Sequence, residues 1–481
     1  MATTAITPNA FLPRQFSLTE TPRNNMVKPV HKRPQKNSHR VAELNKPVAR
    51  RPMETWTKLK ASKHARNTVN PIRKIADAMA VAPNPDKYAI KLNLGDPTIM
   101  GNLPPSQASI DAVREALESH TADGYGPSVG SMPARQAIAD TFSTPSAPIN
   151  PDDVILASGC SHALQMALEA IADNGDNVLV PHPGFPLYTT LCTPHGIGTI
   201  GYQLRMNDDG LIDLDDLESK INQKTRAIII NNPSNPTGIV FPKEHLEDIL
   251  RLAEKYRLTI IADEIYGDLT YDDEVEFIPM ASLSPQVPII SCDGIGKRFL
   301  VPGWRLGWAI VYNRHNVLTD VRAGMVALSQ KIVGPCSLIQ AALPKILKNT
   351  PKSYFDNIRA VVKLNADICY DTFRQIPYLH PLRPQGALYM MVRIDENYLG
   401  SETELIQELI RHESVYCLPG SAFNCPGWFR LVLTYPAEIT RDACQRISKY
   451  CSAKIRGETP ELPSLSSDEY PTSCSSESNE E

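Results

Sequence analysis

The sequence predicts an α/β fold, in which a large domain with a mainly parallel sheet sandwiched by helices is joined to a smaller α+β domain. Three observations support this fold. Short apolar runs rich in β-branched residues alternate with amphipathic helical stretches, and near residue 351 this alternation changes to a long helix followed by strands and further helices. The length of 481 residues also exceeds what one simple core requires.

The elements expected in the large domain follow one another in a regular order. A helix at 162–172 is expected first, followed by strands at 177–180 and 227–230. A second helix at 244–255 and strands at 258–262, 287–290 and 308–311 come next. Parallel strands in such a fold are buried on both faces, which explains why these runs are continuously apolar. Ligands bind open α/β sheets at the carboxyl ends of the strands, so the functional groups are expected there.

The smaller domain has a different pattern. It is expected to contain a long helix at 361–373, strands at 386–392 and 429–434, and two further helices at 405–412 and 440–452. The whole chain is therefore expected to divide into five segments. A disordered basic tail (1–52) is followed by an N-terminal arm that forms part of the small domain (53–110) and by the large domain (111–350). The rest of the small domain (351–456) and a disordered acidic tail (457–481) complete the chain.

Charge and composition exclude several classes of protein. The first tail carries ten Lys and Arg against two acids and the last carries seven acids and no base, yet the whole chain has a net charge of only −4. This balance gives no reason to expect a nucleic-acid partner, and no apolar run is long enough to predict a membrane span. The ten cysteines show no zinc spacing, so no metal is expected and they are interpreted as mostly buried thiols in a reducing compartment. The expected location is the cytoplasm, with the mitochondrial matrix as an alternative because the N-terminal tail is basic.

Four local features lie beside successive strands. They are the turn 231–238, with Asn235 inside it, and then Asp263, Lys297 and Arg305. Each alone has an ordinary explanation as a turn, a helix cap or a surface charge. Their order and separations, 28, 34 and 8 residues, together resemble the class I aminotransferases, which are fold-type I enzymes that depend on pyridoxal 5′-phosphate. The resemblance covers roughly residues 54–455, and further motifs are similar to the branch of the family that acts on tyrosine.

The chemistry of the cofactor explains the first group of residue types. Pyridoxal phosphate needs a primary amine that bonds covalently to its aldehyde carbon, and the resemblance gives this role to Lys297. It places Asp263 beside the pyridine nitrogen, where a carboxylate keeps that nitrogen protonated. Asn235 and Tyr266 match the donors to the ring oxygen O3′. Lys297, Asp263 and Tyr266 are therefore the expected catalytic residues.

The cofactor phosphate calls for backbone donors and a cation. Gly159, Cys160 and Ser161 lead into the first expected helix, whose N-terminal amides suit an anion, and Arg305 can add a two-pronged contact. Many relatives have a serine three residues before the lysine as a further phosphate ligand. This chain has Gly294 there, so that contact is not expected.

The resemblance also assigns the substrate side of the site. Phe185 matches the aromatic residue that stacks on the cofactor ring, with a core aromatic as the alternative. Arg430 matches the arginine that binds the substrate α-carboxylate, helped by Asn235, and Gly95 matches a glycine whose backbone faces the substrate. Tyr125, in a Gly-Tyr-Gly-Pro turn, matches a tyrosine that reaches the cofactor phosphate of a neighbouring subunit. The implied assembly is a homodimer with composite active sites.

The implied reaction is a ping-pong transamination. An aromatic L-amino acid, L-tyrosine above all, gives its amino group to 2-oxoglutarate and leaves as 4-hydroxyphenylpyruvate, a step of tyrosine and phenylalanine catabolism. Two other enzymes remain open on the same residues: an aminotransferase of broad specificity and a cofactor-dependent C–S lyase. A non-enzymatic regulator on this fold is the remaining alternative, and the intact pair of Lys297 and Asp263 argues against it.

Overall fold

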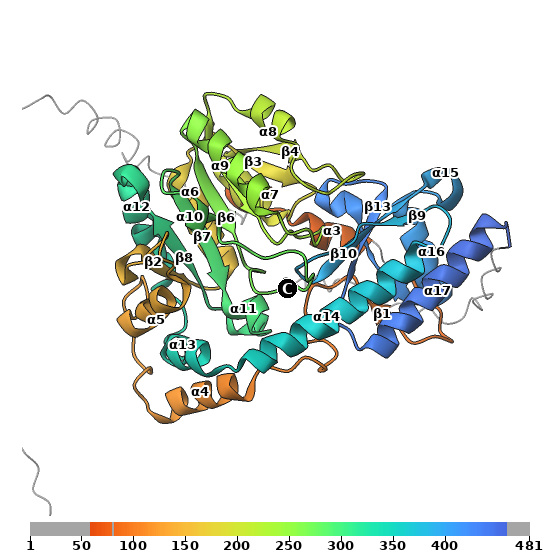
Figure 1. The fold of residues 1–481 in the computed structure, drawn as a ribbon, viewed down its shortest axis with the longest axis horizontal. Helices are drawn as coiled ribbons and strands as arrows, with labels where there is room; N and C mark the ends of the chain where they lie inside the picture. The colour runs from red at the N-terminus through yellow and green to blue at the C-terminus, as the bar shows by residue number, and fades with distance from the viewer. Residues whose placement is uncertain (1–57, 79–80, 459–481) are drawn as a thin grey trace, which may run out of the picture. The chain divides into compact units, whose positions relative to one another are not determined.

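The computed structural model describes residues 58–78 and 81–458, so the predicted tail at 1–52 and nearly all of the predicted tail at 457–481 lie outside the described residues. Its largest sheet has seven strands in the order β2-β8-β7-β6-β5-β3-β4 (Figure 1). Their bounds are Val154–Ala157 for β2, Asn177–His182 for β3, Gly198–Gln203 for β4, Thr225–Asn231 for β5, Thr259–Asp263 for β6, Ile289–Gly294 for β7 and Gly307–Tyr312 for β8.

The prediction of a mainly parallel sheet is confirmed. Strands β7, β6, β5, β3 and β4 run parallel to one another, and β8 is antiparallel to both of its neighbours, β2 and β7. The sequence pattern did not indicate β2 or β4. Strand β4 lies at the edge of the sheet and only one of its six residues is buried, so it lacks the continuous apolar run that marks the central strands.

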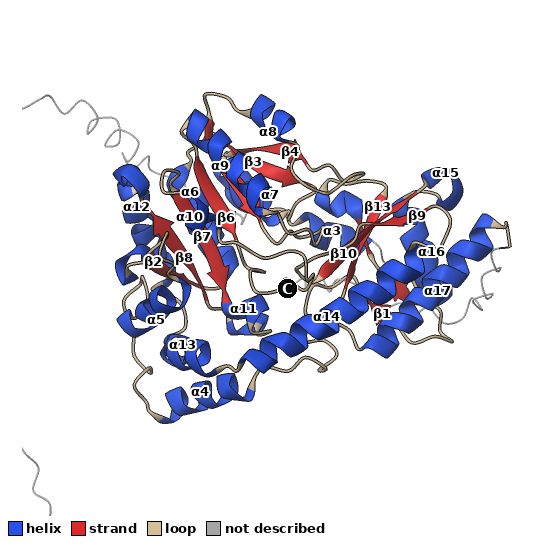
Figure 2. Cartoon of the chain, in the orientation of Figure 1, coloured by secondary structure: helices blue, strands red, loops and turns tan. Residues whose placement is uncertain are grey.

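Helices cover both faces of this sheet (Figure 2). The helices from 107 to 349 are Gln107–Glu118 (α4), Met132–Phe142 (α5), Cys160–Ile171 (α6), Leu187–Cys192 (α7), Leu214–Lys220 (α8), Lys243–Tyr256 (α9), Met280–Leu283 (α10), Ile295–Arg298 (α11), Thr319–Ser329 (α12) and Ser337–Asn349 (α13). Alternate side chains of β5 belong to different apolar clusters: Ala227 and Ile229 pack with α6, α7 and α12, whereas Ile228 and Ile230 pack with α5, α9 and α13.

A second sheet of four antiparallel strands, in the order β12-β13-β10-β9, lies in the C-terminal part of the chain. Its strands are Leu379–Pro381 (β9), Tyr389–Ile394 (β10), Leu418–Pro419 (β12) and Trp428–Val432 (β13). The helices of this part are Lys352–Phe373 (α14), Glu396–Leu399 (α15), Glu402–Glu413 (α16) and Ala437–Ile455 (α17). Helix α14 starts nine residues before the predicted helix at 361–373, because a single amphipathic face continues upstream to Pro351.

Residues from the predicted N-terminal arm contact this C-terminal part. Strand β1, Ile90–Lys91, pairs in parallel with β11, Val415–Tyr416, and the Lys87 ammonium forms an ion pair with Glu413. The arm also holds two short helices, Lys63–Asn67 (α2) and Pro71–Ala78 (α3). The exact domain boundaries stay a prediction. Among residues 58–78 and 81–458, no helix is long and apolar enough to cross a membrane.

Two features of the backbone place functional side chains together. The register aligns Asn231 with Asp263 and Asp263 with Cys292, so β5 and β6 end at the same level and β7 continues two residues further, to Gly294. Helix α6 begins directly after β2, because Gly159 takes a φ of +81° that turns the chain from strand into helix. The carboxyl ends of the parallel strands therefore face the first turn of a helix.

Candidate active site

A cavity of about 580 Å³ opens at the carboxyl ends of β5, β6 and β7. It is lined by Gly95, Cys160, Ser161, Phe185, Asn235, Asp263, Tyr266, Lys297, Arg305 and Arg430, together with Asn93, Leu94, Ile99, Asn231 and Tyr389 among others. Ten of the twelve predicted site residues thus share one cavity. The other two, Gly159 and Tyr125, do not line the cavity, although Gly159 packs against the lining residue Arg305.

Asp263 is the last residue of β6 and is almost fully buried. Its Oδ2 accepts a 2.7 Å hydrogen bond from the phenol of Tyr188, and its Oδ1 accepts a weaker contact from the Cys160 thiol at 3.6 Å. Burial raises the pKa of Asp263 from 3.8 to about 6, although the donors Tyr188, the Ile265 amide and Cys160 oppose the rise. In the described part of the chain no Lys or Arg pairs with this carboxylate, which leaves room for a cationic ligand.

Lys297 lies in the short helix α11, directly after β7, and is half-buried. Its ammonium donates a 2.6 Å hydrogen bond to the carbonyl oxygen of Gly95. The next residue, Arg298, is buried and pairs with Asp293 at 2.8 Å and with Asp268. This pair of bridges fixes the turn that carries Lys297, because Asp293 belongs to β7 and Arg298 to α11.

Arg430 reaches the cavity from β13. Its guanidinium donates to Oδ1 of Asn235 at 3.0 Å and to the carbonyl of Asn93 at 3.2 Å, while its Nε is buried without a partner. Burial lowers the pKa of Arg430, and neighbouring Tyr389 and Tyr266 partly offset this effect. Asn235 is itself held by Asn231, whose Oδ1 accepts the Asn235 amide at 2.7 Å. A buried guanidinium with an unused donor suits a carboxylate ligand.

The opposite end of the cavity can hold an anion. The first turn of α6, with the amides of Cys160 and Ser161, points toward Arg305, whose guanidinium donates to the Ser158 carbonyl at 3.0 Å. The backbone is packed tightly here: a Cβ on Gly307 would lie 2.5 Å from the Cys160 nitrogen, and one on Gly159 would lie 2.7 Å from Arg305. Helix amides beside an arginine form a cradle for a phosphate.

Two tyrosines that meet in this cavity complete the site. Tyr266 and Tyr389 are both buried, and their hydroxyl oxygens lie 2.9 Å apart. Burial raises the pKa of Tyr266 well above its usual value. Sequence reasoning did not single out Tyr389, Tyr188 or Asn231. The first lies within a predicted apolar strand and the second in a loop-to-helix segment, so each has the appearance of a core aromatic.

Tyr125 and Gly294, two of the residues considered in the sequence, do not line the cavity. Tyr125 is 95% exposed and does not line the cavity. Gly294 packs against neighbouring backbone, because a Cβ there would lie 2.8 Å from the Leu306 carbonyl oxygen and 2.9 Å from the Gly307 Cα. Phe185 does line the cavity and makes an edge-to-face contact with Tyr188, with ring centroids 6.0 Å apart.

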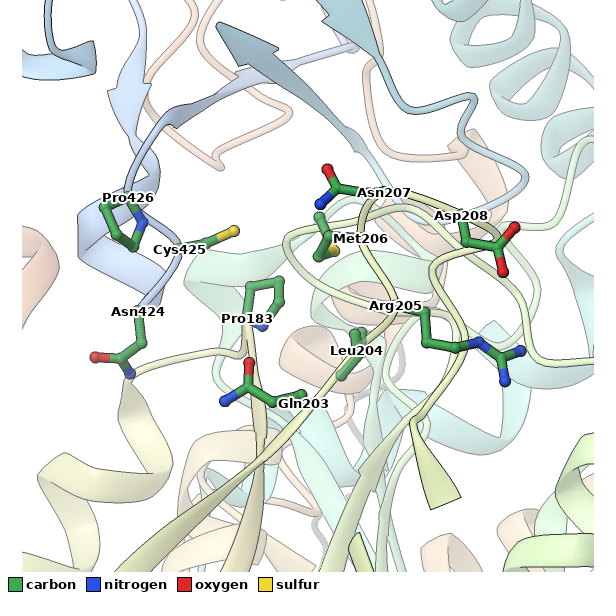
Figure 3. A pocket seen from close by; sticks show the side chains of 10 residues that line it. All are labelled: Pro183, Gln203, Leu204, Arg205, Met206, Asn207, Asp208, Asn424, Cys425 and Pro426. Atoms are coloured by element: carbon green, nitrogen blue, oxygen red, sulfur yellow. The ribbon is translucent and has the colours of Figure 1, made fainter. Parts of the chain in front are cut away.

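A second hollow of about 430 Å³ lies between the loop after β4 and the segment 424–426 (Figure 3). Its lining includes Arg205, Met206, Asp208, Asn424 and Cys425. Arg205 is already paired with Asp209, and burial raises the pKa of the Cys425 thiol to about 12, so that this thiol stays protonated at neutral pH. This hollow therefore lacks the grouping of acid, base and free donor that marks the first cavity.

The donor set of the first cavity fits pyridoxal phosphate. A buried carboxylate without a cation partner suits a protonated pyridine nitrogen, the cradle at α6 suits the phosphate, and Lys297 supplies an amine between them. Phe185, Asn235 and Tyr266 line the space in between.

Comparison with known proteins agrees with this fit. Residues 87–447 match the family model described as aminotransferase class I and II. The chain is 56% identical to tyrosine aminotransferase of Caenorhabditis elegans over 83% of this chain and 86% of that protein. It is 44% identical to tyrosine aminotransferase of Homo sapiens, over 82% of this chain and 88% of that one. The crystal structure of tyrosine aminotransferase from Leishmania infantum superposes with a TM-score of 0.79 at 29% identity, covering 83% of this chain and 99% of the other.

Proposed function

The chain belongs to the class I and II aminotransferases, a family that uses pyridoxal 5′-phosphate, and we propose that it transfers the amino group of L-tyrosine to 2-oxoglutarate. The observation that carries this proposal is the unused donor of Arg430. Its Nε is buried without a partner beside the Asn93 carbonyl and Asn235, where the α-carboxylate of an amino acid would complete its hydrogen bonds. Lys297 lines the same cavity.

The assigned residues divide the chemistry among them. The bound cofactor supplies an electron sink for the pair of electrons left when the substrate Cα–H bond breaks. Lys297 Nζ moves the proton from the substrate Cα, since it is the primary amine that lines the cavity. Asp263 holds a proton on the cofactor nitrogen, and Asn235 and Tyr266 bind the ring oxygen.

The phosphate and the ring have their own partners. The amides of Cys160 and Ser161 and the guanidinium of Arg305 bind the phosphate, and the conformation of Gly159 brings that helix turn into place. Phe185 covers one face of the ring. Gly95 leaves its carbonyl oxygen facing the Lys297 amine.

The lining of the cavity supports an amino donor with an uncharged, apolar side chain. Among the described residues three lysines or arginines line it, and each has a role: Lys297 bonds the cofactor, Arg305 binds the phosphate and Arg430 binds the α-carboxylate. Beside the polar residues Asn93 and Asp96, the rest of the lining includes the apolar side chains of Ile72, Leu94 and Ile99. An aromatic ring gains free energy by burial against such side chains, which favours tyrosine and phenylalanine over aspartate.

The enzyme acts as a homodimer in this proposal. Tyr125 is 95% exposed on a turn that does not reach the cavity of its own chain. The same turn reaches the phosphate of the partner's cofactor, so each active site is built from two chains.

An amino-donor panel tests the proposal. Purified enzyme with pyridoxal phosphate and 2-oxoglutarate is expected to form 4-hydroxyphenylpyruvate from L-tyrosine faster than oxo acids from aspartate or alanine. Pyruvate released from a cysteine conjugate would instead indicate a C–S lyase, and equal rates with all donors would indicate broad specificity.

Two variants serve as controls for that panel. Lys297→Ala should abolish turnover, whereas Lys345→Ala, which removes a surface ion pair with Glu115, should not. Borohydride reduction followed by peptide mapping should place the cofactor on Lys297 alone. Cofactor found on another lysine would contradict the assignment.

We further propose that the enzyme works in the cytoplasm, with the mitochondrial matrix as the alternative. The alternative depends on the net charge of +8 in residues 1–52, where ten Lys and Arg face two acids. Cell fractionation of the full chain and of a chain lacking residues 1–50 distinguishes the two, because only an imported protein changes compartment on this deletion.

A further inference from the structure

Tyr389 lies where the functional groups of the cavity converge. It is the first residue of β10, it is buried, and its hydroxyl oxygen lies 2.9 Å from that of Tyr266. A Cβ built on Gly95 would lie only 2.6 Å from the same oxygen of Tyr389. Because the carbonyl of Gly95 accepts the hydrogen bond from Lys297, the phenol of Tyr389 and the amine of Lys297 both lie against Gly95.

The ring of Tyr389 has a second neighbour. The Arg430 guanidinium lies over it at 4.2 Å from the ring centroid and also lies over the ring of Phe423, at 4.7 Å from that centroid. Stacking of this kind fixes the plane of the guanidinium and therefore the direction of its N–H groups. Tyr389 thus contacts the groups that we assign to the reacting amine and to the substrate carboxylate.

We propose that Tyr389 is a further catalytic residue of this site, whose phenolic oxygen holds the ε-amine of Lys297 while that amine is not bonded to the cofactor and whose ring orients Arg430. Lys297 then donates one hydrogen bond to the Gly95 carbonyl and one to the Tyr389 oxygen. The Tyr389 hydroxyl donates a hydrogen bond to the Tyr266 oxygen. The Tyr266 hydroxyl is then free to donate its own hydrogen bond to the ring oxygen of the cofactor.

The charges around Tyr389 agree with this arrangement. The titratable and charged groups that face it are Lys297, Arg430 and Tyr266. Burial acts to raise the pKa of Tyr389, but the charges of Lys297 and Arg430 and the hydrogen bonds that Tyr266 and Lys297 give to the ionised Tyr389 oxygen outweigh it, so the pKa is lowered. The pKa of its partner Tyr266 is raised. While both phenols are protonated, the stronger acid of the pair, Tyr389, is the one that donates the hydrogen bond between them.

Three variants separate the hydroxyl from the ring. Tyr389→Phe removes only the oxygen, Tyr389→Leu also removes the surface under Arg430, and Tyr435→Phe is the matched control. Tyr435 is a buried tyrosine whose hydroxyl donates to the Lys91 carbonyl at 2.8 Å, and it does not line the cavity. We expect Tyr389→Phe to lower kcat about tenfold with KM for the amino donor unchanged. Tyr389→Leu should in addition raise KM several-fold.

The second measurement does not depend on turnover. In the full-length enzyme with the cofactor in its pyridoxamine form, Lys297 carries no covalent bond, and tyrosinate formation can be followed by ultraviolet absorbance as pH rises. We expect an early-ionising tyrosine that Tyr389→Phe removes, that Tyr435→Phe retains, and that ionises later in Lys297→Ala. An unchanged titration in Tyr389→Phe, or a kcat equal to that of the wild type, would overturn the proposal.

This inference rests on the function proposed above, and its test can fail separately. If the amino-donor panel shows another preferred donor, the kinetic comparison is made with that donor and the tyrosinate titration is unaffected. If L-tyrosine is the preferred donor and Tyr389→Phe still matches the wild type, then only the role of Tyr389 is wrong.

Discussion

The phenol of Tyr188 donates a 2.7 Å hydrogen bond to Asp263, and these two residues are 75 positions apart in the chain. Asp263 ends β6, and Tyr188 lies in α7, the short helix that follows β3. The hydrogen bond offsets part of the cost of burying a carboxylate that has no cationic neighbour among the described residues. It also fixes the direction of the carboxylate toward the cavity, so Tyr188 positions the acid that we assign to the cofactor nitrogen.

The first prediction concerns stability against pH. Because the pKa of Asp263 in the folded chain is about 6 and its ordinary value is 3.8, the folded protein binds this proton more tightly than the unfolded chain does. The free energy of unfolding of the cofactor-free enzyme should therefore fall as pH rises from about 4 to about 6, by up to about 3 kcal/mol from this one group. Urea unfolding across that range measures the fall.

Two variants make the comparison specific to Asp263. Asp263→Asn should remove this part of the pH dependence, whereas Asp140→Asn, which changes an exposed carboxylate on α5, should not. Since the buried carboxylates Glu264 and Asp293 also have raised pKa values, the difference between wild type and Asp263→Asn is the informative quantity. A difference that does not vary with pH would refute the prediction.

The second prediction concerns Arg430 and the substrate. Arg430→Lys replaces a planar fork with a point charge, so one of two parallel hydrogen bonds to a carboxylate is lost. KM for L-tyrosine should rise about tenfold to a hundredfold, while cofactor affinity changes little. Steady-state kinetics and cofactor titration measure the two effects.

Arg393→Lys on the neighbouring strand β10 is the control, because Arg393 does not line the cavity. It should leave both quantities as in the wild type. An unchanged KM in Arg430→Lys would mean that the carboxylate binds elsewhere.

The third prediction concerns the stability of the protein when the glycine at position 294 is replaced. Adding a methyl group there places a Cβ 2.8 Å from the Leu306 carbonyl oxygen, a backbone atom that cannot move without shifting β8. Gly294→Ala should therefore lower the free energy of unfolding by about 1–3 kcal/mol. Gly303→Ala is the matched control, because a Cβ at Gly303 meets nothing within 4 Å. Equal stability of the two variants would show that the strand pair relaxes around the added atom.

These residues show how far the sequence predicts the site. Asp263 and Lys297 could be identified because their order and spacing resemble those of the class I aminotransferases. Each also follows a continuous apolar run, and parallel strands bring such positions to one edge of the sheet. Tyr188 and Tyr389 could not, because an aromatic residue in an apolar context has the same appearance whether it packs in the core or donates a hydrogen bond. Their partners are 75 and 123 positions away.

The fold shows the same limit. The central strands β5 and β6 were predictable because both of their faces are buried, and their apolar runs are therefore unbroken. The antiparallel direction of β8 was not, since a buried strand is equally apolar whichever way it runs.

The last prediction tests the composite active site. In a mixed dimer of one Tyr125→Phe chain and one Lys297→Ala chain, a tyrosine that acts across the interface gives one site with both Lys297 and Tyr125 and one site with neither. The mixed dimer should then recover about half of the wild-type activity, with wild-type cofactor affinity at its intact site, as expected for two independent sites.

If Tyr125 instead acts within its own chain, the site that keeps Lys297 has lost Tyr125, and its cofactor affinity stays as weak as in the Tyr125→Phe homodimer. The 95% exposure of Tyr125 and its absence from the lining of the cavity favour the first outcome. An active monomer in sedimentation would contradict the shared site altogether, because no partner would then be needed to complete it.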